Sequence, residues 1–225
     1  MTSARPALPL LACLLATLLL GACAMEADLA NPPVLYVDEL VTRAWQPEVF
    51  VEPENPPMQP LTAVFFPLRM RPQMANAQPY AEEMSRVFWQ AWLRERVFPA
   101  LAFAQGETWR TPAQAMAVAD GSADLIVGGE ITHVMFGGSS GTTQVSVRLE
   151  VYDAAAGTLL WSMAHAGEMR NAQTRDFIIL TKKSRLPAEP VQAIMTALAQ
   201  DLAVPVKAWN HGQPQEDPAA PSPLD

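Results

Sequence analysis

The residues most open to a catalytic interpretation lie at 137–141, which read Gly-Gly-Ser-Ser-Gly. They match the G-x-S-x-G pattern, in which a strained turn between a strand and a helix exposes a nucleophilic serine. Asp153 and His165 follow Ser139 in the order that such hydrolases use. Here an alternating strand follows the serine in place of a helix, so we expect a hairpin loop. A serine hydrolase-like enzyme using Ser139, Asp153 and His165 is the alternative function.

Neither the histidines nor the neighbouring acids predict a metal site or an acid–base pair. His133 and His165 fall on the first and third strands of a predicted meander, and the spacing offers no third ligand. Glu82 and Glu83 are adjacent on a predicted helix, where neighbouring side chains point apart. We therefore expect no metal, no cofactor and no enzymatic activity.

A third group of residues is suited to binding. An apolar run, Phe177 to Leu180, is followed at once by a basic cluster in an otherwise acidic protein. Four consecutive apolar residues on a strand cannot all face inward, because alternate side chains point to opposite faces. An exposed apolar patch beside positive charge suits an acidic or apolar partner, including another copy of the chain. We predict a partner contact there; the alternatives are a strand covered by the closing helix, or a solvated loop. The predicted residues are Phe177, Ile178, Ile179, Leu180, Lys182, Lys183 and Arg185.

Residues 1–22 are typical of a signal peptide. Arg5 precedes an apolar stretch at 8–20, which is shorter than the roughly 20 residues that span a bilayer. The sequence Leu-Gly-Ala-Cys at 20–23 resembles the bacterial lipoprotein cleavage site. That resemblance implies cleavage before Cys23 and acylation of its thiol and amino group, palmitate being a typical acyl group. Ala24 is not the aspartate that resembles an inner-membrane retention signal, so we expect the periplasmic face of the outer membrane. A secreted protein cut elsewhere, or an uncleaved anchor, is the alternative.

Composition narrows the class of protein further. The 225 residues carry 23 acidic against 15 basic side chains, a net charge of −8 that becomes −9 when Arg5 is removed. This balance argues against a nucleic-acid groove. The two cysteines both lie within the first 23 residues, which excludes a disulfide framework and a cysteine-ligated zinc site.

The chain divides into four parts by composition. The signal peptide, 1–22, precedes a lipidated cysteine and proline-rich spacer at 23–60, an α+β domain at 61–209 and a disordered tail at 210–225. The spacer contains an apolar cluster at 34–37, 40–41 and Trp45. We expect that cluster to pack on the domain, because large apolar residues are normally buried; contact with a partner is the alternative.

Periodicity predicts the elements of the domain. We expect a buried strand at 61–68, a helix at 79–97, a strand at 98–104, and a short helix from its cap Thr111 to Ala119. A three-stranded meander follows at 125–136, 145–152 and 158–163, and a final helix at 191–208 is kinked or ended by Pro205. The order β-α-β-α-β-β-β-α predicts an α+β fold, a mixed sheet with helices packed on it.

Four stretches carry a family resemblance: the strand at 63–68, Ala-Asp-Leu-Ile-Val-Gly-Gly-Glu-Ile at 123–131, the hairpin from Val151-Tyr152-Asp153 to Leu159-Leu160-Trp161, and the closing helix. Together they resemble a superfamily of periplasmic lipoproteins. It includes CsgG-like curli-secretion lipoproteins, penicillin-binding-protein activator lipoproteins, the Pel export lipoprotein and the TolB N-terminal domain. The matched residues are fold signatures, with Asp153 and Gly157 forming the turn and Trp161 filling the core. The short tip at 137–141 lacks the long membrane hairpin of the curli channels.

These observations predict a non-enzymatic lipoprotein of the cell envelope. It would bind or scaffold an envelope assembly or a secretion or export machine from the outer membrane. Its expected partners are the membrane through the lipid anchor, a periplasmic or outer-membrane protein, and further copies of itself, since some relatives form rings.

Overall fold

The structure, a computed structural model, describes residues 34–38, 40–138, 141–170, 174–177 and 180–212. The predicted signal peptide, Cys23 and the tail from residue 213 lie outside the described residues. The chain forms two compact units. One comprises Met1–Tyr36 and Thr174–Lys183, and the other Val37–Gln173 and Ser184–Asp225.

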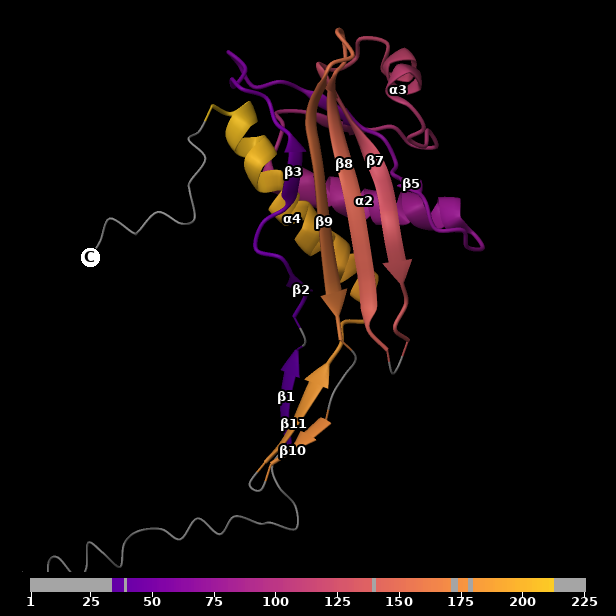
Figure 1. The fold of residues 1–225 in the computed structure, drawn as a ribbon, viewed down its shortest axis with the longest axis vertical. Helices are drawn as coiled ribbons and strands as arrows, with labels where there is room; N and C mark the ends of the chain where they lie inside the picture. Colours follow the sequence, from indigo (N-terminus) through magenta and orange to yellow (C-terminus); the bar gives the residue numbers. More distant parts are fainter. Residues whose placement is uncertain (1–33, 39, 139–140, 171–173, 178–179, 213–225) are drawn as a thin grey trace, which may run out of the picture. The chain divides into compact units, whose positions relative to one another are not determined.

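The larger unit is built on one mixed sheet, whose strands run in the order β2-β9-β8-β7-β4-β6. Figure 1 shows the long strands β9, β8 and β7 side by side. β4 is parallel to β6 and β7, whereas β7, β8 and β9 form an antiparallel meander. β3 also pairs with β9, and β5 with β7. The predicted α+β class and the meander are confirmed. The bounds are β2 Thr42–Arg43, β3 Glu48–Val51, β4 Ala63–Phe65, β5 Arg69–Met70, α2 Ala77–Glu95, β6 Leu101–Phe103, α3 Pro112–Ala119, β7 Leu125–Met135, β8 Thr143–Asp153, β9 Leu159–Met169 and α4 Pro190–Asn210.

The main core lies between the sheet and the helices α2 and α4. Alternate residues of β8 supply its floor, and Val145, Val147, Leu149 and Val151 are all buried. Trp92 of α2 is fully buried and its indole Nε1 donates a hydrogen bond to the carbonyl of Ala199 in α4, at 2.8 Å. The two helices are therefore joined to each other as well as to the sheet.

Among the described residues, none of the helices combines the length and the apolar character that a membrane-spanning helix needs.

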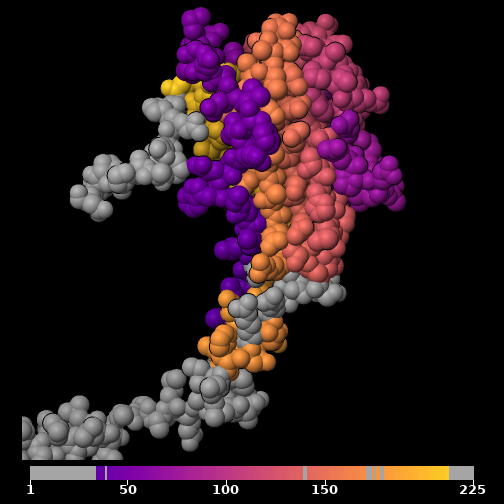
Figure 2. Space-filling view, viewed as in Figure 1, coloured from indigo at the N-terminus to yellow at the C-terminus, as the bar shows by residue number. Residues whose placement is uncertain are grey.

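A smaller core covers part of the opposite face of the sheet. α3 packs there with Trp109, Phe66 and Ile126, and Gly128 of β7 leaves room for the indole, since a Cβ would lie 2.0 Å from it. The predicted cap of α3 is confirmed, because the Thr111 hydroxyl accepts from the backbone N–H of Gln114. Much of β8 and β9 on this face forms molecular surface (Figure 2).

The proline-rich segment contributes to the sheet. β2 pairs with β9 at Thr42↔Glu168, and β3 at Glu48↔Ala164, so this segment is more than the spacer that composition predicts. Val41 packs against the main core, as expected. Leu40 and Trp45 are 79% and 84% exposed, so the predicted packing is wrong for these two side chains.

α4 continues past Pro205 to Asn210. The sequence predicts a kink or an end at this proline. Because Pro205 has no N–H, the carbonyl of Asp201 lacks its usual donor four residues on. The helix continues despite this missing hydrogen bond because one of its faces is buried against the sheet. That face includes Leu198, Leu202 and Val206.

A second sheet has three strands in the order β1-β11-β10, with β1 Val34–Asp38, β10 Thr174–Asp176 and β11 Thr181–Arg185. Its residues 34–36, 174–176 and 181–183 belong to the smaller unit. β10 and β11 are antiparallel, and the backbone N–H of Phe177 donates to the carbonyl of Leu180 at 2.8 Å. The run 177–180 thus spans the reversal between two strands. Its interpretation as a single strand is wrong, because the chain turns within it.

Asp124 joins the start of β7 to the residue before β4. Its Oδ2 accepts hydrogen bonds from the backbone N–H and the hydroxyl of Thr62, at 2.8 and 2.7 Å. These two bonds lower the pKa of the Asp124 carboxyl. The ionised carboxylate therefore contributes stability above its unfolded pKa of about 4, and that contribution is lost as the pH falls through the lowered, folded pKa.

Asp124→Asn is accordingly expected to lower the melting temperature at pH 7, and by less as the pH approaches 2. Thermal melts followed by circular dichroism across this range test the expectation. Asp120→Asn removes the same charge from an exposed helix C-cap and is the control. Equal losses at every pH for Asp124→Asn would show that its ionised carboxylate has no special role.

Candidate functional site

The structure does not bring together Asp153 and His165 of the hydrolase pattern. Asp153 ends β8, and its Oδ1 accepts from the backbone N–H groups of Ala155 and Ala156. His165 lies in β9 opposite Val147, which is separated from Asp153 by roughly 20 Å of strand at about 3.3 Å per residue. Asp153 is therefore a turn residue, and the proposed triad is wrong. Ser139 lies outside the described residues.

The carboxylate that does face His165 is Asp201 of α4. Nε2 of the buried imidazole lies 2.9 Å from Asp201 Oδ2, which also accepts from Arg43 Nε. Arg43 Nη2 donates to the other oxygen at 3.2 Å, and the hydrogen bond to Asp201 raises the pKa of Arg43. Both carboxylate oxygens are thus occupied. We call Arg43, His165 and Asp201 the clasp, since it ties β2 to β9 and α4.

A groove of about 410 Å³ lies beside the clasp. Its lining consists of Val41, Thr42, Arg43, Ala44, Trp45 and Asp201. The charged groups in this lining, Arg43 and Asp201, already bind each other. The clasp positions the N-terminal segment and offers no free acid, base or nucleophile of its own.

The two histidines lie on opposite faces of the sheet. His133 pairs with Ser146 and His165 with Val147, and these neighbouring β8 residues point to opposite faces. Across the part of the chain that the structure describes, no three histidine, cysteine or acidic side chains are grouped as metal ligands would be.

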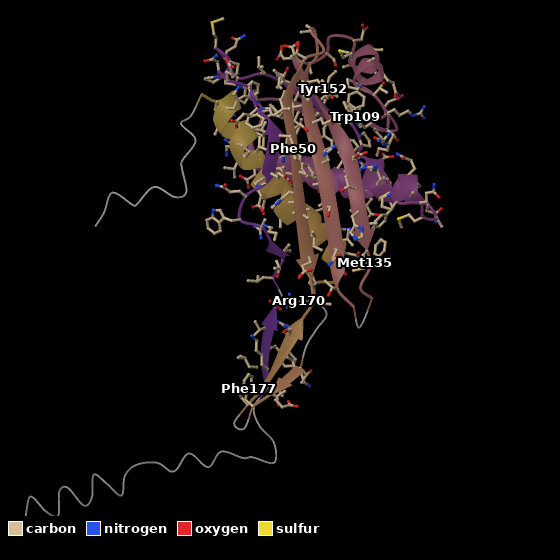
Figure 3. All side chains as sticks on the ribbon, in the orientation of Figure 1. Phe50, Trp109, Met135, Tyr152, Arg170 and Phe177 are labelled. Carbon is tan, nitrogen blue, oxygen red and sulfur yellow. The ribbon has the colours of Figure 1, made fainter. Side chains whose placement is uncertain are left out.

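Charged groups on the second face of the sheet are paired within the chain. Arg69 and Arg71 both bind Glu130, at 2.7 and 3.4 Å. The guanidinium of Arg148 lies over the ring of Phe50, and Figure 3 labels Phe50, Trp109 and Tyr152 in this unit. Burial, together with Glu150, raises the pKa of Tyr152 to about 12. In each of these pairings, the charged group is bound by another residue of the same chain.

The predicted partner residues fall mainly in the hairpin of the smaller unit. Phe177 is 53% exposed at the end of β10 (Figure 3), and Leu180, Lys182 and Lys183 are half-buried. Arg185 lies at the end of β11, within the larger unit, and binds Asp38 at 2.9 Å. Ile178 and Ile179 lie outside the described residues.

β1 adds apolar residues that the sequence interpretation assigned elsewhere. Val34, Leu35 and Tyr36 are 43%, 53% and 55% exposed, although the sequence predicts that their cluster packs on the domain. Their apolar and aromatic types, directly after two prolines, are the pattern that indicates a strand here. We call the described residues 34–36, 174–177 and 180–183 the small sheet.

Comparison with known proteins adds a likeness of fold. No protein-family model matches the sequence, and no curated protein matches it. Similar solved structures include a PelC dodecamer from Paraburkholderia phytofirmans, with 13% identity over 73% of this chain and 98% of that chain and a TM-score of 0.44. The lipoprotein GNA1162 from Neisseria meningitidis has 15% identity over 48% and 79%, with a TM-score of 0.34. The LpoB C-terminal domain from Salmonella enterica has 10% identity over 50% and 87%, with a TM-score of 0.30.

The identities are low and every one of these TM-scores is below 0.5. The function is therefore argued from the residues of this chain.

Proposed function

We propose that this chain is a non-enzymatic lipoprotein that binds or scaffolds an envelope assembly, such as a secretion or export machine. It is held at the periplasmic face of the outer membrane by acyl chains on Cys23. The observation that carries the proposal is the small sheet, which leaves its apolar side chains exposed. Among the residues of the small sheet whose burial the structure describes, only Thr181 is buried. Exposed apolar groups gathered in this way are typical of an interaction surface.

The docking contact would include the predicted residues of this region: Phe177, Ile178, Ile179, Leu180, Lys182, Lys183 and Arg185. Lys182 follows Leu180 by two residues in β11, so a positive charge adjoins the apolar turn. An apolar surface flanked by positive charge fits a counterpart that is apolar and acidic.

The acyl chains on Cys23 are sufficient to hold the protein at the membrane, so the folded domain is not needed for attachment. Each buried methylene of an acyl chain contributes about 0.8 kcal/mol, and stable attachment takes more than one chain or a second signal. A fully acylated cysteine meets that requirement. The fold is then free to serve as a binding domain, which agrees with the use of His165 and Asp201 in the clasp rather than in chemistry.

The native mass of the protein tests the scaffold function. Cells that express the full chain at its native level are cross-linked and solubilised in mild detergent, and the extract is fractionated by size. The wild type and Ser139→Ala should both migrate in a particle well above the 24.5 kDa of one chain. A wild type that migrates as a single chain after cross-linking would contradict a scaffold. A Ser139→Ala variant that loses the protein's function in the cell while keeping the particle would favour an enzyme that uses this serine.

A further inference from the structure

We infer that the small sheet docks on the phospholipid surface to which the chain is tethered, so that the apolar and acidic counterpart of its docking contact is the bilayer itself. This inference rests on the lipid anchor of the proposed function. It assigns an occupant to Val34, Leu35, Tyr36 and Phe177, with Lys182 and Lys183 beside them.

The length of the leader places the small sheet near the bilayer. Ten residues, 24–33, separate Cys23 from Val34, and they span at most about 35 Å at roughly 3.3–3.6 Å per residue. Tethering by so short a linker gives an effective concentration in the millimolar range. A contact of low intrinsic affinity is therefore enough to keep the small sheet on the membrane.

The apolar side chains of the small sheet face outward on both sides. Consecutive residues of a strand point to opposite faces, and Val34, Leu35 and Tyr36 are all exposed. A small sheet normally needs a covered apolar face for stability. Tyrosine suits the boundary between headgroups and acyl chains, where its ring is buried and its hydroxyl stays hydrated, and leucine and phenylalanine suit the apolar side of that boundary.

The charge of the hairpin is opposite to that of the protein. Residues 174–183 carry Arg175, Lys182 and Lys183 against Asp176, whereas the mature chain is strongly acidic. Basic residues at a membrane surface are attracted by anionic lipids. Glu26 and Asp28 in the leader oppose this attraction. Salt should therefore weaken the contact without abolishing it, because the apolar side chains persist.

The mature chain carrying Cys23→Ser contains no thiol, because both cysteines of the sequence are then absent. A single cysteine can thus report on one position. Phe177→Cys is labelled with an environment-sensitive fluorophore, and Phe136→Cys is the matched control, since Phe136 of the larger unit is 51% exposed against 53% for Phe177. Vesicles of phosphatidylethanolamine and the anionic lipid phosphatidylglycerol are the membrane, and they are added to millimolar lipid, the effective concentration that the tether would supply.

The label at 177 should shift to shorter wavelength and brighten when vesicles are added, and the label at 136 should not. In sedimentation with the same vesicles, Leu35→Asp with Phe177→Asp should reduce binding by roughly tenfold. Leu40→Asp with Phe136→Asp, which places the same charges on the larger unit, should leave it unchanged. Melting of each variant checks that the larger unit stays folded.

Three results would overturn the inference. One is a label at 177 that does not respond to vesicles; another is an equal response at 136. The third is a response at 177 to protein concentration alone, which would assign the surface to a second copy of the chain. In each case the cross-linked particle described above can persist, so the scaffold function stands. If the cross-linked particle were absent while vesicle binding was intact, the scaffold function would be contradicted instead.

Discussion

Replacing Trp92 by alanine is expected to lower the free energy of unfolding by about 3–5 kcal/mol, the range for removal of a large buried side chain. The indole is fully buried and packs against Phe88 and Phe98, with ring centroids 5.5 and 5.8 Å away. Its loss leaves the carbonyl of Ala199 without its donor from α2. Urea denaturation of the mature Cys23→Ser chain, followed by circular dichroism, measures the change.

Two other tryptophans calibrate this prediction. Trp45 is 84% exposed, so Trp45→Ala should change the unfolding free energy by less than about 0.5 kcal/mol. Trp161 is buried, as the sequence predicts, but its Nε1 has no hydrogen-bond partner among the described residues. Trp161→Phe should therefore cost less than Trp92→Phe. Equal effects of Trp92→Ala and Trp45→Ala would show that α2 and α4 do not meet through this ring.

Cys23→Ser should move the protein from the membrane to the soluble periplasmic fraction, because serine offers no thiol for acylation. Fractionation followed by a carbonate wash measures the shift, and the wash removes weak peripheral contacts such as that of the small sheet. The intact mass of the purified variant should lack every acyl group.

Cys13→Ser is the matched control for the anchor. Cys13 lies within the apolar stretch of the signal peptide and is removed by cleavage, so the mature product should be acylated and membrane-bound as in the wild type. Retention of Cys23→Ser in the membrane after the wash would contradict the lipid anchor and point to an uncleaved signal segment.

The elements that sequence predicts correctly are those whose pattern is local. The alternation at 145–151 places the buried side of β8, and the Thr111 cap with Pro112 fixes the start of α3. The long helices follow from their apolar stripes. Each of these features can be identified from neighbouring residues, because a strand or helix period appears within a single window.

The features that escape sequence analysis depend on distant pairing. β2 is two residues long, and its place is defined by contact with β9 far along the chain. The clasp unites Arg43 and Asp201, which are 158 residues apart, so no spacing could indicate it. The run at 177–180 reads equally as a buried strand or a turn. Only the pairing of β10 with β11 decides between them.

The attachment of the proline-rich segment to β9 has a mechanical consequence. Tension applied through the proposed lipid tether reaches β1, and then Thr42 and Glu48, before it reaches β4, the first strand inside the core. The pairing of β1 with β11, and after it the short ladders of β2 and β3 with the Arg43–Asp201 ion pair, therefore detach before β4 under load. Once they detach, the segment up to residue 60 becomes part of the tether, and the core strands keep their hydrogen bonds. The protein can thus yield to a pull between membrane and partner without unfolding.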